Sequence, residues 1–298
     1  MPIPLIHPIT LIKESWKTFT KTWETTIKYS SWMILASVLS SALLFLPEGN
    51  WILNIFAGIL YLISIVLAVW IGISLYQVIL AMENGKTISK ETTKTAVSLI
   101  LPLSVVALIG GVFTIGGFIA FILPGIYIGI RLGFAQLSLI EQPIKAKNIW
   151  VSFVVPHIVF IASLLLGNVY PTDWMRIVVQ LGAFIYLGYA YYQLFKEFRA
   201  PLDASWTMTR DKFWAIFGRQ ALGGLCFGII FLMATFIAVW IVSMISGVNI
   251  FEASGSNNAS PAVVGADNII NGVIQAAFLP LVSIFQVKLY NSVKKSRS

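Results

Sequence analysis

The sequence predicts an all-α membrane protein, a polytopic bundle of about eight transmembrane helices with amphipathic interfacial helices on its cytoplasmic side. The composition is the first observation, because 58% of the 298 residues are hydrophobic and only 11% are charged. Soluble domains carry about 25% charged residues. The second observation is a series of long apolar runs, and the third is that the basic residues flank these runs. Lipid is therefore the solvent that suits this chain.

Eight apolar runs approach the length of about 20 residues that a helix needs to cross a bilayer. Only the tripeptide Leu123-Pro124-Gly125 separates the third run from the fourth. A tight turn is expected there, because proline cannot continue a helix and glycine permits unusual backbone angles. We predict spans near residues 31–47, 55–80, 97–121, 126–141, 149–167, 177–195, 219–246 and 268–290.

The lysines and arginines predict the orientation of these spans. With eight spans, 18 of the 20 basic residues fall on one side, which the positive-inside rule identifies as cytoplasmic. Both termini and the segment 196–219 are then cytoplasmic, and the expected location is the inner (cytoplasmic) membrane. The whole chain, 1–298, forms one integral membrane domain. Residues 247–267 are expected to form a flexible outer loop.

Residues 10–29 have the pattern of a helix that lies in the membrane surface. Aromatic side chains recur on one helical face, and lysines form a stripe beside it. The rings would anchor in the acyl boundary, and the lysines would meet anionic lipid headgroups. Plain anchoring and specific lipid binding both remain open. The predicted anchor residues are Trp16, Phe19, Trp23, Lys13, Lys17 and Lys21.

Two polar positions inside the spans are candidates for function. Arg131 lies in the fourth span, where an arginine is costly, and it could bind an anion or line a pathway. Alternatively it could reach the outer interface or cap its own broken helix. His157 follows Pro156 in the fifth span and is expected near Tyr186 and Tyr189 of the sixth. Such a group could relay protons, or it could fix helix packing.

Small residues predict a close helix contact in the fourth span. Gly125, Gly129 and Gly133 recur every four residues on one face, which lets a second helix approach closely. Arg131 points to the opposite face, so packing and charge are expected on different sides of this helix.

Several motifs together resemble the YciC-like bacterial inner-membrane proteins, which are similar to the membrane domain attached to some glycerophosphodiester phosphodiesterases. The motifs are a basic Ser-Trp helix before the first span, the Leu-Pro-Gly turn, Arg131-Leu132 leading to Glu141, and the later segment Ala204 to Arg210. The resemblance implies a helical membrane domain and no established activity. The chain departs from the family in two extra spans at 149–195, which raise the usual number of six spans to eight. The phosphodiesterase chemistry does not transfer, because His7 and His157 are the only histidines.

No motif in the sequence predicts catalysis, a cofactor or a metal site. A single cysteine, Cys226, cannot form a disulfide or a cysteine metal site within one chain. Nucleic acid is not expected as a partner, because the basic residues do not form one patch. We therefore expect a non-catalytic membrane protein with a role in envelope organisation or as a subunit of a membrane complex. The alternative is a small-solute or lipid transporter that uses Arg131 and His157.

Overall fold

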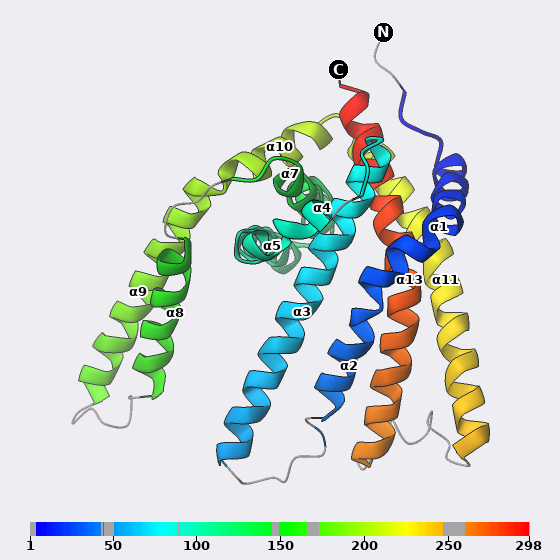
Figure 1. The fold of residues 1–298 in the computed structure, drawn as a ribbon. Coiled ribbons are helices and arrows are strands. Elements are labelled where there is room, and N and C mark those ends of the chain that lie inside the picture. Colours follow the sequence, from blue (N-terminus) through cyan, green and yellow to red (C-terminus); the bar gives the residue numbers. More distant parts are fainter. Residues whose placement is uncertain are drawn as a thin grey trace. The chain divides into compact units, whose positions relative to one another are not determined.

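The computed structural model describes residues 4–297 apart from 43, 45–50, 89, 145–148, 166–172 and 247–259. The described residues form helices and no strands, which confirms the all-α fold (Figure 1). In chain order the helices are α1 (Pro8–Ser30), α2 (Trp32–Ala42), α3 (Trp51–Glu83), α4 (Lys90–Lys94), α5 (Ala96–Ala120), α6 (Ile122–Leu132), α7 (Ala135–Glu141), α8 (Ile149–Leu165), α9 (Asp173–Glu197), α10 (Arg199–Thr209), α11 (Phe213–Ser246) and α13 (Pro261–Lys295).

Six of the helical segments in the described part of the chain are long and apolar enough to cross a membrane. They are Ile55–Glu83, Ala96–Ala120, Ile122–Glu141, Trp174–Glu197, Phe213–Ile245 and Pro261–Lys295. The other two predicted spans correspond to α2 and α8, which are apolar but shorter as described. Most of the residues that follow α2 and α8 lie outside the described part.

The break between the third and fourth predicted spans lies two residues earlier than expected. Phe121 is the extended residue between α5 and α6, and Pro124 and Gly125 belong to the first turn of α6. Proline is tolerated in a first turn because the amide N–H groups there have no partner within the helix. A second break, which the apolar run concealed, separates α6 from α7 at Gly133 and Phe134.

The predicted outer loop 247–267 is too long at its C-terminal end. Residues 247–259 lie outside the described part, but α13 already begins at Pro261. Ser260 caps this helix, since its side chain accepts a hydrogen bond from the Val263 N–H. The last seven residues of the expected loop are therefore helical.

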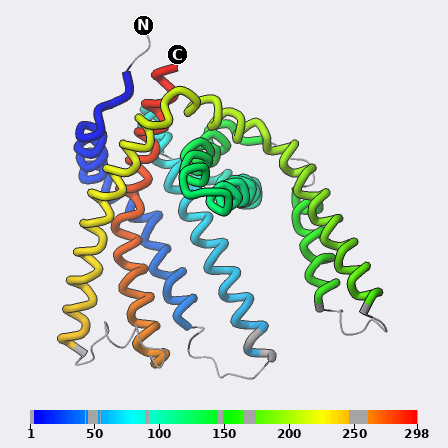
Figure 2. Tube along the Cα trace, turned by 180° about the vertical axis from the view of Figure 1, so that it is seen from behind, coloured from blue at the N-terminus to red at the C-terminus, as the bar shows by residue number. Residues whose placement is uncertain are grey.

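The chain divides into two compact units, and the first comprises Met1–Ile100 and Lys212–Ser298. Within it α13 packs against α1, α2, α3 and α11. Figures 1 and 2 both foreshorten α1, whereas α2, α3 and α13 extend along the page, so α1 lies crosswise to them. The N-terminal and C-terminal segments lie together, where the Ile6 N–H donates to Ser292 Oγ at 3.0 Å.

The core of this first unit lies at one end of its long helices. The C-terminal half of α3 is buried from Ile71 to Leu80, whereas its N-terminal half exposes most side chains from Ile55 to Val66. Most buried residues of α13 likewise lie in its second half, where Tyr290 is almost fully enclosed. Apolar side chains that face outward on a spanning helix suit lipid, so the exposed half is the part that a bilayer would surround.

The second unit, Leu101–Asp211, contains most of α5 and all of α6 to α10. Helices α8 and α9 pack side by side, as the short connection between the two predicted spans indicates (Figure 2). Helix α10 packs on α6 and α7. This last contact contains Arg131.

Candidate functional site: an arginine clasp in the second unit

Arg131 is 4% exposed and holds the C-terminal end of α10. Its Nη1 donates to the main-chain oxygen of Trp206 at 2.8 Å, and its Nη2 donates to the Tyr127 hydroxyl. The guanidinium carbon lies 4.8 Å from the centre of the Tyr127 ring and 4.6 Å from that of Trp206. A carbonyl in the last turn of a helix lacks a main-chain partner within the helix and carries partial negative charge, so a cation is favoured there. The Trp206 oxygen also accepts from Thr209 Oγ1 at 3.2 Å. Two aromatic faces add cation–π attraction.

Ser205, the neighbour of Trp206, bridges the break between α6 and α7 by hydrogen bonds. Its hydroxyl donates to the Arg131 main-chain oxygen at 2.6 Å and accepts from the Phe134 N–H at 3.2 Å. These two main-chain groups belong to the end of α6 and the start of α7. One buried hydroxyl therefore joins the two helices where the regular pattern of hydrogen bonds stops. We refer to Tyr127, Arg131, Ser205 and Trp206 as the clasp.

The clasp corrects the expectation for Arg131. Its guanidinium does not cap its own helix, because it donates to a carbonyl of another helix, α10. Its Nε is buried and has no hydrogen-bond partner among the described residues. The clasp also joins two of the sequence motifs quoted above, Arg131-Leu132 and Ala204-Ser205-Trp206.

His157 has a tyrosine partner, but it is neither of the expected ones. His157 Nε2 lies 2.7 Å from the Tyr191 hydroxyl, and Nδ1 lies 2.5 Å from the main-chain oxygen of Phe153. A carbonyl only accepts, so Nδ1 carries the proton and Nε2 accepts from Tyr191. Tyr186 and Tyr189 are exposed, because α9 turns the face with Tyr191 toward α8. The pair joins the two helices of this hairpin.

Arg131 and His157 bind different neighbours within the second unit. Tyr191 also lines an apolar groove of about 560 Å³ against α5, and Arg131 is not among the residues that line it. Neither Arg131 nor His157 lines this groove, whereas the transport alternative requires a cavity that both residues share.

The three glycines of α6 differ in their surroundings. A Cβ added to Gly125 would lie 2.3 Å from Cγ of Phe118, and one added to Gly129 would lie 3.3 Å from Thr114. Both therefore face α5. Gly133 lies beyond the end of α6, and an added Cβ would meet only the carbonyls of its own turn. Gly125 and Gly129 mark the α5–α6 contact, and Gly133 does not.

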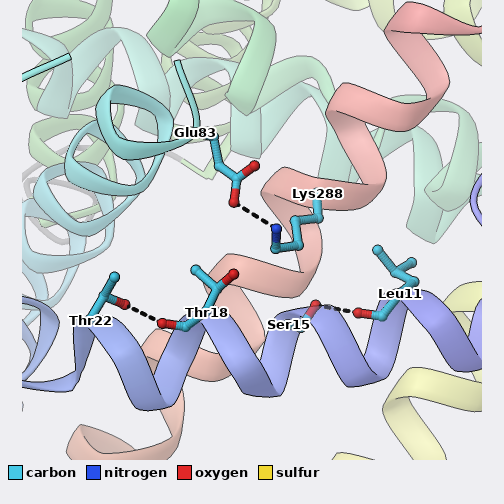
Figure 3. A network of polar contacts seen from close by, with 6 residues as sticks. All are labelled: Leu11, Ser15, Thr18, Thr22, Glu83 and Lys288. Carbon is cyan, nitrogen blue, oxygen red and sulfur yellow. Dashed lines mark hydrogen bonds and ion pairs between the residues drawn. The ribbon is translucent and has the colours of Figure 1, made fainter. Parts of the chain in front are cut away.

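Helix α1 turns its hydroxyl side chains inward and its aromatic side chains outward. Ser15, Thr26 and Ser30 are fully buried, whereas Trp16 and Trp23 are exposed and Phe19 is half-buried. Ser15 Oγ donates to the Leu11 oxygen (Figure 3) and Thr26 Oγ1 donates to the Thr22 oxygen, whereas Ser30 Oγ has no hydrogen-bond partner among the described residues. The rings form a tilted contact between Trp16 and Phe19, with centroids 5.8 Å apart, and an edge-to-face contact between Phe19 and Trp23, with centroids 5.2 Å apart. The predicted lysines Lys13, Lys17 and Lys21 are exposed.

The structure contains an ion pair beside α1 that the apolar pattern of the sequence did not predict. Lys288 Nζ of α13 lies 2.8 Å from Glu83 Oε1 of α3, and both side chains are largely buried (Figure 3). The clasp residues Tyr127, Ser205 and Trp206 were also missed as site residues. The one available clue was that Arg131 and Trp206 both belong to the quoted motifs. The sequence does not show that the two motifs are in contact.

Within the described ranges, no three histidine, cysteine or acidic side chains gather as a metal site would require. The chain matches no protein-family model, no curated protein and no solved structure. The arguments for its function therefore come from the residues themselves.

Proposed function

We propose that this chain is a non-catalytic integral protein of the inner (cytoplasmic) membrane, with a structural role in envelope organisation or as a subunit of a membrane complex. The clasp carries the proposal. The guanidinium of Arg131 is occupied by a carbonyl, a phenol and two ring faces, all from its own chain. An arginine that served an anion or a solute would need donors directed at an open space. This one joins two helices.

The proposal includes eight spans, with α2 and α8 completing the six long apolar segments. The distribution of lysine and arginine supports an even number, since an odd number would divide the basic residues between the two sides. A relation to the YciC-like membrane proteins is part of the same proposal. The contact between two of the quoted motifs supports it, because each motif supplies a hydrogen-bond donor to a main-chain oxygen of the other.

Helix α1 is proposed to lie in the inner leaflet surface, bound to anionic lipid headgroups. Its crosswise direction, outward rings and exposed lysines support this placement (Figure 1). A face with Trp16 and Trp23 on it is favourable at the boundary between acyl chains and water.

The histidine offers a test of a structural role against a transport role. His157→Gln keeps a side chain that can accept from Tyr191 but removes the imidazole, which is the group that a proton relay would need. In a strain that lacks the protein, we expect this variant to restore the barrier to a hydrophobic dye as well as the wild type does. Tyr191→Phe, which loses the hydroxyl, serves as the companion variant.

Dye entry would be measured at matched amounts of membrane-inserted protein. Loss of function by His157→Gln at wild-type abundance would contradict the structural role and favour proton-linked transport.

A further inference from the structure

A polar pocket lies between α2, α3 and α13 in the first unit. Its volume is about 310 Å³, which is at the lower end of the range for ligand pockets. Three helices that are far apart in the sequence contribute hydroxyl and amide side chains to it. The polar lining residues are Ser37, Ser40, Tyr61, Ser64, Asn268, Asn271 and Gln275.

The pocket lies at the depth of the hydrocarbon core. Trp32 and Trp70 pack edge to face with centroids 6.5 Å apart, and α3 becomes buried directly after Trp70. Tryptophans concentrate at membrane boundaries, so this pair marks the inner boundary. Tyr61 precedes Trp70 by nine residues, or about 14 Å at 1.5 Å per residue. That distance is close to half of a hydrocarbon core about 30 Å thick.

The amides in the pocket have unused hydrogen-bonding capacity. Ser40 Oγ bonds to the Ala36 oxygen and to Ser64 Oγ, at 3.0 Å and 3.2 Å, so these hydroxyls are paired. Within the described part of the chain, no hydrogen bond engages the side chain of Asn268, Asn271 or Gln275. Their spacing of three and four residues places them on one face of α13. Each amide offers donors and an acceptor, and leaving these unpaired in hydrocarbon is costly.

We propose that this pocket binds an uncharged polar group that carries several hydroxyls. No charged side chain lines the pocket, so an ion would lie near the midplane without a counter-charge. Hydroxyls donate and accept, which matches the three amides and the tyrosine. Tyr61 and Gln275 are exposed, so the pocket opens to the side and admits either a free polyol or the headgroup of a glycolipid. The site is independent of Arg131 and His157.

Thermal unfolding of the purified full chain in phosphatidylcholine nanodiscs tests the proposal. One sample contains monogalactosyl diacylglycerol in the bilayer, and another contains methyl galactoside in the buffer. A ligand that binds only the folded state raises Tm. A rise with the lipid alone identifies a headgroup, and a rise with the free sugar identifies a solute. A rise with neither overturns the proposal.

Two variants locate the effect. Asn271→Leu with Gln275→Leu should reduce the rise in Tm by about fivefold or more, as expected for lost affinity. Gln286→Leu makes the same change on the same helix, but Gln286 lines a different pocket, so the rise should persist. If the double variant does not fold, Gln275→Leu alone replaces it, since Gln275 is exposed. If the variant shows the same rise in Tm as the wild type, the proposal is overturned. It is also overturned if the substitution converts a dimer of the chain into a monomer, because the amides would then face a second copy.

Discussion

Ser205 and Arg131 connect three helices by satisfying main-chain groups that the helices themselves leave open. Arg131 serves a carbonyl of α10, and Ser205 serves the end of α6 and the start of α7. Each motif thereby completes the helix that bears the other. This reciprocity explains in physical terms why a Ser-Trp pair and an intramembrane arginine occur in the same chain.

Replacing Ser205 with alanine should destabilise the protein measurably. The change removes one hydrogen bond from each of two main-chain groups, the Arg131 oxygen and the Phe134 N–H, at a cost of about 1–3 kcal/mol. The free energy of unfolding would be measured in mixed micelles titrated with dodecyl sulfate, with circular dichroism as the readout.

Ser163→Ala is the matched control for Ser205→Ala. Ser163 is also buried in the second unit, but its hydroxyl bonds only to the Phe160 oxygen of its own helix. We expect a change within about 0.5 kcal/mol. Equal effects of the two substitutions would mean that Ser205 does not join α6 to α7.

The histidine shows why the sequence indicated a partner type but not the partner. Tyr186 and Tyr189 share a helical face, and Tyr191 lies about 200° from Tyr189 at 100° per residue. Which face of α9 meets α8 depends on how the hairpin packs. In a span that is apolar on all sides, the hydrophobic pattern does not distinguish the faces.

At the scale of elements, α5 and α6 approach so closely that glycine is required at Gly125. An added Cβ would lie 2.3–2.7 Å from three atoms of the Phe118 ring, and these are near the base of the ring. Gly117 faces the same contact, since its added Cβ would meet the Gly125 Cα at 2.9 Å. The two helices thus touch through their backbones.

Gly125→Ala should destabilise the protein, and Gly116→Ala should not. Overpacking at Gly125 is expected to cost about 1–3 kcal/mol. Gly116 on α5 has no atom within 4 Å of its added Cβ, so alanine there should stabilise the helix by about 0.5–1 kcal/mol. The same micelle titration compares them, and effects of one sign would contradict the close contact.

Hydropathy located the helices well, but the sequence placed one interruption two residues too late and missed another. The apolar run that predicted the fourth span continues through Gly133 and Phe134, where α6 gives way to α7. Such a break needs an external partner for its main-chain groups, and Ser205 lies about seventy residues away. Conversely, α3 and α13 extend beyond their predicted spans, and the mostly polar residues 291–295 are still part of helix α13.

For the molecule as a whole, the proposed eight spans require both ends to lie on the cytoplasmic side. We expect reporter fusions at Gly49, Asn168 and Ser256 to report the outside and a fusion at Ser298 to report the inside. The physical reason is the concentration of lysine and arginine in the remaining connections. Alkaline phosphatase and a fluorescent protein would be used as opposite reporters at each site. An external C-terminus would contradict this topology.

The difference in burial between the two ends of the long helices in the first unit bears on how the protein responds to membranes of different thickness. Its enclosed core begins directly after Trp70 of the Trp32–Trp70 pair, whereas the N-terminal half of α3 exposes most of its side chains. Hydrophobic mismatch is relieved by tilting where neighbours do not hold a helix. A thinner or thicker bilayer should therefore splay or straighten the outer halves of these helices. The enclosed core, with the Glu83–Lys288 pair beside it, would keep its form from one lipid composition to the next.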